Sequence, residues 1–591
     1  MSAELKRLFD LPYYQLEQYP LERSFSSKVN GKWVSISSQQ LVDQANEVSR
    51  GLLAMGVKPG DKVGLISNNR YEWHIMDIGI LQIGAINVPI YPTISASDYE
   101  YIFNHSELKI VVVSSTEILD KVNQIKANVP SLNGVYTFDA IDGEKHWSEI
   151  KSRNGEVDQE EVKKIMDGVD TLDMASIIYT SGTTGRPKGV MLSHANILSN
   201  VIASGVRFPA TNGHKSLSFL PICHIYERTL TYLYIKEGTS VFFAESMETI
   251  GDNIKEIKPE VFSAVPRLLE KVFDKIIAKG QEQTGIKKML FFWAVELGEQ
   301  WEPNGENGAF YEWKLSIANK IIFSKWREAL GGKVIAIASG SAALQPRLAR
   351  VFNAAQIPIF EGYGLTETSP VISVNELDNE GLMIGTVGRV IDKVTVKFGP
   401  DGEILAKGPN VMMGYYKDPE KTKEVLTDDG WFHTGDIGEM VGKTKDFLKI
   451  TDRKKEMFKT SGGKYIAPQV IENMLKESRF IEQAMVIGEN RKHPAVLVVP
   501  AFEFITEWCK RHEMTCNTPG EIAGNDKIKS RIWKDVEKIT AGLGKWEIPK
   551  KMELCTDVWS IENDELTPTL KLKRKVILAK HQDEVNRIYG D

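Results

Sequence analysis

Short apolar runs alternate with helical patterns through the first part of the chain, and this alternation limits the fold more than any other feature. Residues 39–56 have the spacing of an amphipathic helix and lead into the run KVGLIS at 62–67. A helical pattern at 73–84 precedes the run AINVPIY at 85–91, and another helical pattern follows at 98–106. β-Rich runs that alternate with helices are typical of βαβ units around a parallel sheet. The sequence therefore predicts an α/β fold.

The length of 591 residues predicts two or more domains. After about residue 450 the chain changes to a smaller, lysine-rich α+β pattern. The segment 450–459 (ITDRKKEMFK) is charged and unsuited to a core, so the boundary is placed there. We predict a large N-terminal domain at 1–454 and a small C-terminal domain at 455–591.

Composition excludes several classes of protein. The formal net charge of −6 does not favour a nucleic-acid binder. The four cysteines are scattered without a CxxC pair, which indicates a reduced, cytoplasmic protein. The start MSAELKRLFDLPYYQLEQ has no apolar signal region, and no stretch approaches the ~20 apolar residues of a membrane span. Any membrane contact would be peripheral, and both a monomer and a homodimer remain open.

The motif with the clearest chemistry is YTSGTTGRPKGV at residues 179–190. It follows an apolar run and precedes a helical pattern that has Ser193 near its start. Glycines allow backbone N–H groups to approach a polyphosphate, hydroxyls donate further bonds, and Lys188 supplies a point charge. The spacing is not that of a Walker A loop. A flexible surface loop is the alternative interpretation.

Two further motifs suit a nucleotide. In EGYGLTET (361–368), Tyr363 stands between glycines and can lay its ring against a base, while Glu367 is a hard oxygen ligand for Mg²⁺. In GWFHTGDIG (430–438), Asp436 is expected at a strand end between glycine turns, where it can accept ribose hydroxyls. The alternatives are a tight turn with a packed tyrosine, and a Gly-Asp turn between two strands.

The last two motifs are charged. Residues 452–456 (DRKKE) are followed by 461–466 (SGGKYI), for which a solvated linker is the alternative. Residues 566–574 (LTPTLKLKR) would by themselves be an exposed basic tail. The helical stretch 281–330 is rich in aromatic residues and is broken by a turn at 302–308. It has three interpretations, in order: packed helix surface, the mouth of an acyl tunnel, or shallow membrane contact.

Together, in this order, the five motifs resemble the adenylate-forming superfamily of acyl-CoA synthetases, luciferases and nonribosomal-peptide adenylation domains, from about residue 30 to 580. The segments 219–229, 264–272 and 566–574 look most like long-chain fatty acyl-CoA synthetases. The resemblance implies layered sheets with flanking helices and a small mobile α+β C-terminal domain. His224 matches a position between the acyl tunnel and the nucleotide, with a hydrogen-bonded core histidine as an equal alternative.

The implied reaction activates a long-chain fatty acid with ATP and Mg²⁺ to an acyl-adenylate, which CoA then converts to acyl-CoA. The alternatives are an acid of another chain length, or a fatty acyl-AMP ligase that delivers to a carrier protein. By resemblance, Thr366 contacts the α-phosphate, Glu367 the Mg²⁺, and Asp436 with Arg453 the ribose. The other implied ATP- or AMP-binding residues are Thr180, Ser181, Gly182, Thr183, Thr184 and Lys188 at the β/γ-phosphates, and Ser339, Gly340, Ser341, Glu361, Gly362, Tyr363 and Gly364 around the AMP moiety.

The C-terminal motif departs from the superfamily pattern Pro-x-Thr-x-x-Gly-Lys. Counting without a gap assigns the adenylation lysine to Lys573, and Lys571 is the alternative. Lys455 matches the hinge about which family members rotate their C-terminal domain. Gly462 and Gly463 match residues that line the pantetheine tunnel of CoA.

Overall fold

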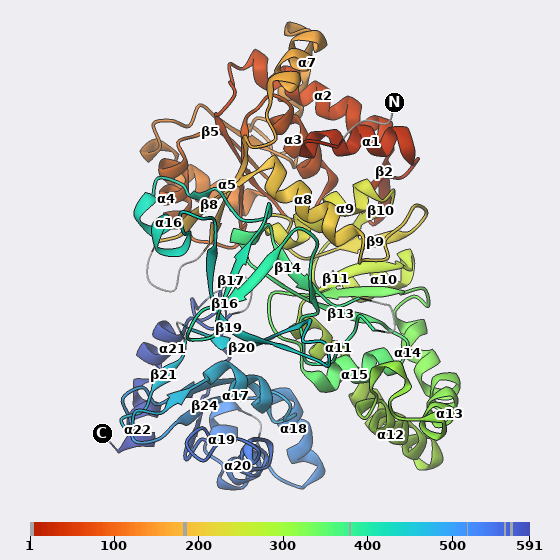
Figure 1. The fold of residues 1–591 in the computed structure, drawn as a ribbon, viewed down its shortest axis with the longest axis vertical. Coiled ribbons are helices and arrows are strands. Elements are labelled where there is room, and N and C mark those ends of the chain that lie inside the picture. Colours follow the sequence, from red (N-terminus) through yellow and green to blue (C-terminus); the bar gives the residue numbers. More distant parts are fainter. Residues whose placement is uncertain are drawn as a thin grey trace. The chain divides into compact units, whose positions relative to one another are not determined.

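The computed structural model describes residues 5–180, 186–376, 380–454, 456–516, 518–560, 563–567 and 571–590 (Figure 1). Across these residues, no helix combines the length and the apolar character that a membrane crossing requires. The chain divides into two compact units, which are described separately. The first consists of Met1–Val396, Ala406–His433 and Val441–Leu448, and the second of Lys397–Leu405, Thr434–Met440 and Lys449–Asp591.

A mostly parallel seven-stranded sheet forms one part of the first unit, and it confirms the predicted α/β alternation. β3 pairs in parallel with both β4 and β5, and their registers run through five residue pairs each. These strands are buried along nearly their whole length, as expected where helices cover both faces of a parallel sheet. Across the sheet the strands are β18 (Gly414–Tyr415), β8 (Lys188–Ser193), β7 (Met174–Thr180), β4 (Ile86–Ile90), β3 (Lys62–Ile66), β5 (Leu108–Val113) and β6 (Gly134–Thr137).

The helices around this sheet begin where the sequence provides caps. The side chain of Ser37 accepts from Gln40 N at the start of α2, and Ser193 accepts from Asn196 N at the start of α8. The Ser193 cap confirms the helix expected after the 179–190 motif. The helices are α1 (Leu11–Gln18), α2 (Ser38–Ala54), α3 (Tyr71–Gln82), α4 (Ala96–Ser106), α5 (Thr116–Ile125), α6 (Ser148–Ser152), α7 (Gln159–Gly168), α8 (His194–Gly205) and α9 (Ile225–Lys236).

A second sheet completes the first unit. Its central strands β9, β11, β12 and β13 are parallel, and β14 turns back against β13. In order, the strands are β2 (Lys32–Ile36), β1 (Phe25–Val29), β10 (Ser240–Phe243), β9 (Lys215–Ser218), β11 (Val261–Ala264), β12 (Ala336–Ser339), β13 (Ile359–Gly364), β14 (Val371–Val374) and β15 (Arg389–Val390).

Figure 1 shows α2 and α7 at one end of the first unit and α12 and α13 at the other. The expected turn after residue 302 is present as a short 3₁₀ turn, Pro303–Gly305, between α12 and α13. The remaining helices of the unit are α10 (Ile250–Ile257), α11 (Pro266–Gln281), α12 (Gly285–Glu299), α13 (Ala309–Ala318), a π-helical turn (Asn319–Phe323), α14 (Ser324–Ala329), α15 (Pro346–Ala354) and α16 (Pro419–Val425).

A buried ion pair joins α9 to α3. Arg228 Nη2 lies 2.6 Å from Asp77 Oδ1, and neither side chain has any exposed surface. Arg228 also donates to Ser176 Oγ on β7 at 2.8 Å, and Asn87 Nδ2 on β4 donates to Asp77 at 2.6 Å. The Tyr232 hydroxyl donates to the same carboxylate. Because the charges are paired and hydrogen-bonded, the network fixes α9 against β7 instead of leaving isolated buried charges.

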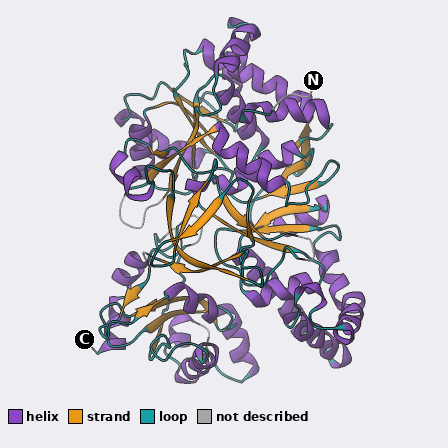
Figure 2. Ribbon diagram, viewed as in Figure 1, coloured by secondary structure: helices purple, strands orange, loops and turns teal. Residues whose placement is uncertain are grey.

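The second unit contains a smaller α+β assembly around a three-stranded sheet (Figure 2). β23 and β24 are antiparallel, and β25 adds in parallel to β24. Its elements, some shared in part with the first unit's residues, are β16 (Thr395–Phe398), β17 (Glu403–Lys407), β19 (Phe432–Val441), β20 (Phe447–Arg453), β21 (Phe458–Lys459), β22 (Tyr465–Ile466), α17 (Pro468–Leu475), β23 (Ile481–Ile487), β24 (Ala495–Pro500), α18 (Phe502–Arg511), α19 (Pro519–Ala523), α20 (Asp526–Thr540), β25 (Met552–Leu554), α21 (Arg574–Lys580) and α22 (Gln582–Tyr589).

Two local expectations were wrong. Asp436 was expected at a strand end beside glycine turns, but β19 runs without interruption through Phe432–Val441, with Asp436 near its middle. The segment 450–459 was expected to be unsuited to a core, but Asp452 lies in β20 and is 4% exposed. Burial raises the pKa of this carboxyl to about 7.

Candidate functional site

Lys188 is placed at the start of a strand by a β-hairpin. β7 ends at Thr180 and β8 begins at Lys188, and these two residues are directly paired. Both ends of the predicted phosphate loop are therefore held by the ends of two neighbouring strands of the first sheet. Ser181, Gly182, Thr183 and Thr184, which belong to the same prediction, lie outside the described residues.

Tyr415 links Lys188 to Glu367, and sequence reasoning missed it. β18 pairs with β8, so that Tyr415 stands opposite Val190. The Tyr415 hydroxyl donates to Glu367 Oε1 at 2.9 Å, and Lys188 Nζ lies 4.7 Å from the centre of the Tyr415 ring. The structure thus brings together a cation and a carboxylate from two separate motifs around one buried tyrosine.

α8, the helix that follows β8, forms hydrogen bonds to the two segments that carry Tyr415 and Glu367. Asn196 Nδ2 donates to the carbonyl oxygens of Pro409 and Val411, at 2.8 and 2.9 Å. One turn later, Asn200 Nδ2 donates to Val371 O at 2.8 Å. Backbone pairing completes the connection, since Met412 N donates to Glu367 O at 2.9 Å. Lys188, Glu367 and Tyr415 are therefore positioned by one β8–α8 element.

The predicted adenosine-binding residues come from the ends of neighbouring strands. Ser339 at the end of β12 pairs with Glu361 on β13, so the segments 339–341 and 361–364 start side by side. Glu361 is 7% exposed and accepts from Leu344 N at 3.1 Å, and burial raises the pKa of its carboxyl to about 8. Tyr363 is half-buried on β13. Thr366 begins a short 3₁₀ turn, Thr366–Thr368.

His224 caps a helix. Its Nδ1 accepts from Tyr226 N at 3.1 Å at the start of α9, and the residue is half-buried, not part of the core. The Tyr226 ring in turn lies against Gly340, where a Cβ would stand 3.2 Å from the ring. Glycine therefore allows the closest approach of the 339–341 segment to the start of α9. The predicted role of His224 between acyl chain and nucleotide stays a prediction.

In the second unit, the two predicted ribose ligands are neighbours. Arg453 Nε lies 3.2 Å from Asp436 Oδ1, across the adjacent strands β20 and β19. Buried Glu403 supports them from β17, because it accepts from Gly435 N at 3.1 Å and from Lys454 Nζ at 2.8 Å. Glu403 was not predicted, since nothing in its local sequence marks it. In this arrangement Asp436 can accept hydrogen bonds from the two hydroxyls of a sugar, and Arg453 can donate to them.

The C-terminal basic motif is not simply an exposed tail. Leu566 is 5% exposed, and the Arg574 guanidinium contacts Glu472 Oε2 at 2.6 Å and Glu456 Oε2 at 3.0 Å. Lys573, immediately before it, forms an ion pair with Asp564. The backbone of Thr567 pairs with that of Lys571. Residues 568–570 of this motif lie outside the described residues.

The residues predicted to line the CoA passage lie in a short turn of the second unit. Gly462 and Gly463 form a turn between β21 and β22, and Gly463 has a φ of +74°. A Cβ built at Gly463 meets no atom of the described residues within 4 Å, so this backbone is accessible. Lys455, the predicted hinge, lies outside the described residues.

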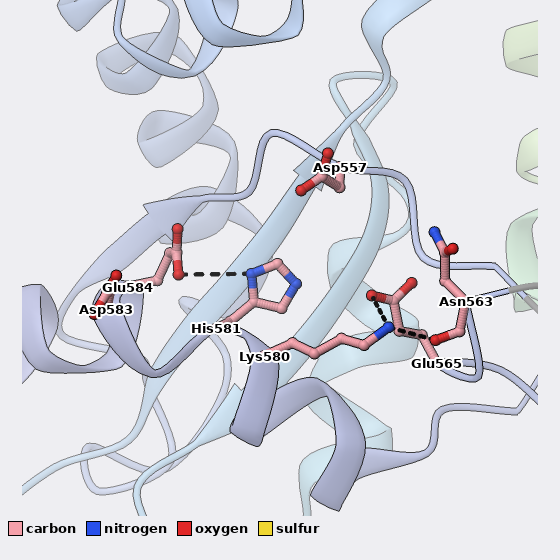
Figure 3. Close-up of a pocket in the computed structure, with 7 residues that line it drawn as sticks. All are labelled: Asp557, Asn563, Glu565, Lys580, His581, Asp583 and Glu584. Carbon is pink, nitrogen blue, oxygen red and sulfur yellow. Dashed lines mark hydrogen bonds and ion pairs between the residues drawn. The ribbon is translucent and has the colours of Figure 1, made fainter.

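A pocket of about 360 Å³ in the second unit is a different kind of site (Figure 3). Its lysine is already paired, since Lys580 Nζ lies 3.3 Å from Glu565, and the His581 ring, whose Nε2 accepts from Trp559 Nε1, has its Nδ1 3.6 Å from Glu584. Asp557 and Asp583 add two more carboxylates. This excess of negative charge repels a polyphosphate, so the pocket is not a nucleotide site.

Family comparison covers nearly the whole chain. Residues 13–416 match the AMP-binding enzyme family, and residues 456–591 match the AMP-binding enzyme C-terminal domain. Long-chain-fatty-acid–CoA ligase FadD15 of Mycobacterium bovis is 31% identical over 95% of this chain and 93% of its own length. Long-chain-fatty-acid–CoA ligase 5 of Rattus norvegicus is 34% identical over 94% of this chain and 84% of its own.

Solved structures agree on the fold. The anthranilate CoA ligase AuaEII, in complex with anthranoyl-AMP, has a TM-score of 0.74 at 18% identity over 98% of both chains. ATP-bound MatB from Rhodopseudomonas palustris has a TM-score of 0.71 at 22% identity, over 99% of this chain and all of its own. At these identities the likeness concerns the fold alone, and it confirms the predicted layered α/β fold with a smaller C-terminal domain.

Proposed function

Since this chain belongs to the AMP-binding enzyme family, we propose that it is an AMP-forming long-chain-fatty-acid–CoA ligase. A fatty-acid carboxylate oxygen attacks the α-phosphorus of ATP, and the bond to the pyrophosphate oxygen breaks. The resulting acyl-adenylate has AMP as its leaving group. The sulfur of CoA then attacks the acyl carbon, AMP departs with the bonding pair, and the thiol proton is lost to solvent.

The observation that carries this proposal is the arrangement of Lys188, Tyr415 and Glu367. A lysine that begins β8 supplies positive charge next to the predicted phosphate loop, and Glu367 supplies an oxygen ligand held by the Tyr415 hydroxyl. Phosphoryl-type transfer needs mainly positioning and charge neutralisation, and these three side chains supply both.

Glu367 fits the Mg²⁺ that accompanies ATP. Mg²⁺ in nucleotide sites is held by one or two carboxylates together with phosphate oxygens and water. Among the described residues, no group of three or more His, Cys, Asp and Glu side chains is arranged to hold a metal ion. Glu367 is one such carboxylate: it is half-buried, and the Tyr415 hydroxyl that donates to it also lies on the ring that faces Lys188. When bound, the ion neutralises phosphate charge.

The second unit supplies the other assigned roles. Asp436 and Arg453 bind the ribose, and their ion pair of 3.2 Å supports this assignment. Lys573 bridges the fatty-acid carboxylate and the α-phosphate, with Lys571 as the alternative. We further propose domains at 1–454 and 455–591 that rotate about Lys455, and Gly462 with Gly463 lining the passage of CoA. In this assignment, Lys573 leaves its ion pair with Asp564 during adenylation and binds the substrate instead.

The same proposal includes the compartment, the partners and the oligomeric state of the enzyme. The cysteines are four buried free thiols, which suits a reducing cytoplasm. The partners are small molecules, namely a fatty acid, ATP and CoA, together with a peripheral contact to the membrane. Light scattering of the purified chain distinguishes a monomer from a homodimer.

The direct test is AMP release from ATP across a panel of fatty and aryl acids, with and without CoA. We expect CoA-dependent AMP release, with acyl-CoA as the product and the highest kcat/KM for long-chain acids. Lys188→Ala should raise the KM for ATP, whereas Lys423→Ala, whose side chain is 75% exposed, serves as the matched lysine control. Acyl-AMP that accumulates unchanged in the presence of CoA contradicts the proposal and indicates a ligase that delivers to a carrier.

A further inference from the structure

Two arginines of the second unit share one carboxylate. Glu456 Oε1 lies 3.9 Å from Arg453 Nη1, and Glu456 Oε2 lies 3.0 Å from Arg574 Nε. At the start of α17, Gln469 Nε2 donates to Glu456 Oε2 at 2.8 Å and helps to fix its orientation. Because the Glu456 side chain is only 14% exposed, salt and water screen these contacts weakly. Glu456 therefore connects β20, which carries Arg453, with the start of α21.

Each arginine lies beside a residue with an assigned role in adenylation. Arg453 forms the ion pair with Asp436 that is proposed to bind the ribose. Arg574 directly follows Lys573 in the chain and is the first residue of α21. The Lys573 carbonyl oxygen accepts from the backbone N–H of Ile577, whose side chain is fully buried. The backbone of Lys573 is therefore attached to the same helix end that carries the Arg574 guanidinium.

The far side of the Arg574 guanidinium is held by a buried carboxylate. Arg574 Nη1 and Nη2 donate to the two oxygens of Glu472 at 2.8 and 2.6 Å, and this paired contact sets the plane of the guanidinium. Glu472 is 3% exposed and also accepts from Val486 N at 2.6 Å. Burial raises the pKa of Glu472, and the Arg574 charge opposes this shift. The guanidinium is thus fixed in a plane that directs its Nε at Glu456.

Together these side chains form a series of alternating charge. Asp436, Arg453, Glu456, Arg574 and Glu472 follow one another as carboxylate and guanidinium in turn. Glu456 stands at the centre and contacts both arginines. Neutralising it would break the series in the middle, whereas each arginine would keep its outer carboxylate. The loss of this one charge would therefore change the alignment of the two halves more than the stability of either half.

The two ends of the series act on one substrate molecule. In ATP the ribose is joined to the α-phosphate through one carbon and one oxygen, so a group that holds the ribose also determines where the α-phosphorus lies. A lysine that bridges this phosphate and a fatty-acid carboxylate must keep a fixed position relative to the ribose site. Correct positioning of reacting groups supplies a large part of the rate in such reactions.

We propose that Glu456 is a positioning residue for adenylation, which aligns Lys573 with the ribose-bound nucleotide through Arg574 and Arg453. This inference rests on the function proposed above and on its assignment of Lys573. Glu456 acts through the two arginines and binds no substrate in this assignment. Its removal should therefore lower the rate of adenylation and leave the affinity for the nucleotide nearly unchanged.

Single-turnover kinetics of the full chain test this role, with the two half-reactions measured separately. Glu456→Gln should lower acyl-adenylate formation by about tenfold or more, whereas AMP affinity and thioester formation from supplied acyl-AMP should stay within about twofold of wild type. Glu553→Gln is the matched control and should change neither half-reaction. Glu553 lies on β25 of the same unit, is 18% exposed, and pairs with Lys529 at 2.9 Å.

A nucleotide without ribose hydroxyls tests the coupling itself. 2′,3′-Dideoxy-ATP cannot be held through those hydroxyls, so the alignment of Lys573 with the ribose pair no longer positions the α-phosphate. The loss caused by Glu456→Gln should therefore shrink from about tenfold with ATP to about threefold or less with the analogue, because the two changes remove the same alignment. An ion pair that only stabilised the fold would give the same factor with both nucleotides.

The inference is overturned if Glu456→Gln adenylates as fast as wild type, if both half-reactions fall by the same factor, or if the loss is equal with the two nucleotides. Urea denaturation checks folding. If Glu456→Gln unfolds at lower urea than Glu553→Gln, Arg574→Lys is tested in its place. It keeps a positive charge beside Glu472 but lacks the fork that reaches both carboxylates, so the same selective loss of adenylation is expected. A wild-type chain that forms no acyl-adenylate contradicts the proposed function instead, so the two failures are distinguishable.

Discussion

The Tyr415 hydroxyl donates a hydrogen bond of 2.9 Å to Glu367 Oε1, while the Tyr415 ring faces the Lys188 ammonium. Burial raises the pKa of this tyrosine, and the nearby Glu367 carboxylate raises it further. The phenol therefore keeps its proton at neutral pH and remains a donor. One side chain thus orients a carboxylate and a lysine that come from separate sequence motifs.

Removing that donor tests whether Glu367 must be oriented. Tyr415→Phe keeps the ring under Lys188 but frees the carboxylate, and one such hydrogen bond contributes about 1 kcal/mol. We expect the KM for Mg-ATP to rise about fivefold, with a matching shift in the Mg²⁺ titration. Tyr416→Phe, at the next position, is the matched control and should keep wild-type kinetics. Equal kinetics of both variants would show that Tyr415 has no role in orienting Glu367.

The ribose assignment predicts a loss of nucleotide affinity. Asp436→Asn removes the charge that accepts from the sugar hydroxyls and pairs with Arg453, so AMP binding measured by calorimetry should weaken by about tenfold to a hundredfold. Glu439→Gln changes an exposed carboxylate on the same strand and should bind AMP like wild type. Unchanged affinity in Asp436→Asn would remove the ribose role from this pair.

The two candidate lysines can be separated by half-reaction. Lys573→Ala should lower acyl-adenylate formation by about a hundredfold or more, because it removes the charge that bridges the reacting groups. Thioester formation from supplied acyl-AMP should remain close to wild type, since that step does not use the lysine. Lys571→Ala is the matched comparison. If Lys571→Ala loses adenylation and Lys573→Ala retains it, the assignment is reversed.

The buried ion pair predicts a stability effect remote from nucleotide contacts. Asp77→Asn leaves the fully buried Arg228 cation without its counter-charge, which costs about 3–5 kcal/mol in the free energy of unfolding. Urea denaturation measures this cost. Glu160→Gln breaks the pair with Lys163, in which both side chains are more than half exposed, and should leave the urea midpoint close to that of wild type. Similar midpoints for the two variants would contradict the role given to the buried network.

Glu361 predicts a pH dependence of stability. Its pKa is about 8 in the fold and 4.5 in its ordinary state, so between these values the folded protein holds a proton that the unfolded chain has lost. The free energy of unfolding therefore falls as pH rises through this window, by up to about 1.4 kcal/mol per pH unit, and levels above it. Glu361→Gln should flatten this decline in thermal melts. Glu227, whose burial raises its pKa to about 7, adds a slope of the same sign that remains in the variant. An identical slope in variant and wild type would refute the assignment.

The alternating pattern predicted much of the first sheet because each element carries its own periodicity. The predicted run at 62–67 became β3 (Lys62–Ile66), and the helical pattern at 39–56 became α2 (Ser38–Ala54). The Ser193 cap was also readable from the sequence, since a serine before a helical pattern satisfies the first free N–H groups. These features are local, so sequence alone specifies them.

What sequence reasoning missed depends on long-range contacts. Tyr415 and Glu403 act through partners in distant segments, and no local signal distinguishes them from other buried residues. Asp436 was placed at a strand end because glycines flank it, yet β19 continues through both glycines, since its alternate residues are buried. The assigned roles of the site residues and the domain boundary at 454/455 stay predictions.

The Arg574 guanidinium joins segments of the second unit that lie far apart in the sequence. Its contact with Glu456 closes a loop of 118 residues, and its contact with Glu472 one of 102. Glu456 follows the proposed pivot by one residue, and Lys573 precedes Arg574. In the proposed rotation about Lys455, this contact holds Glu456 and the segment of Lys573 together, so that the two move as one.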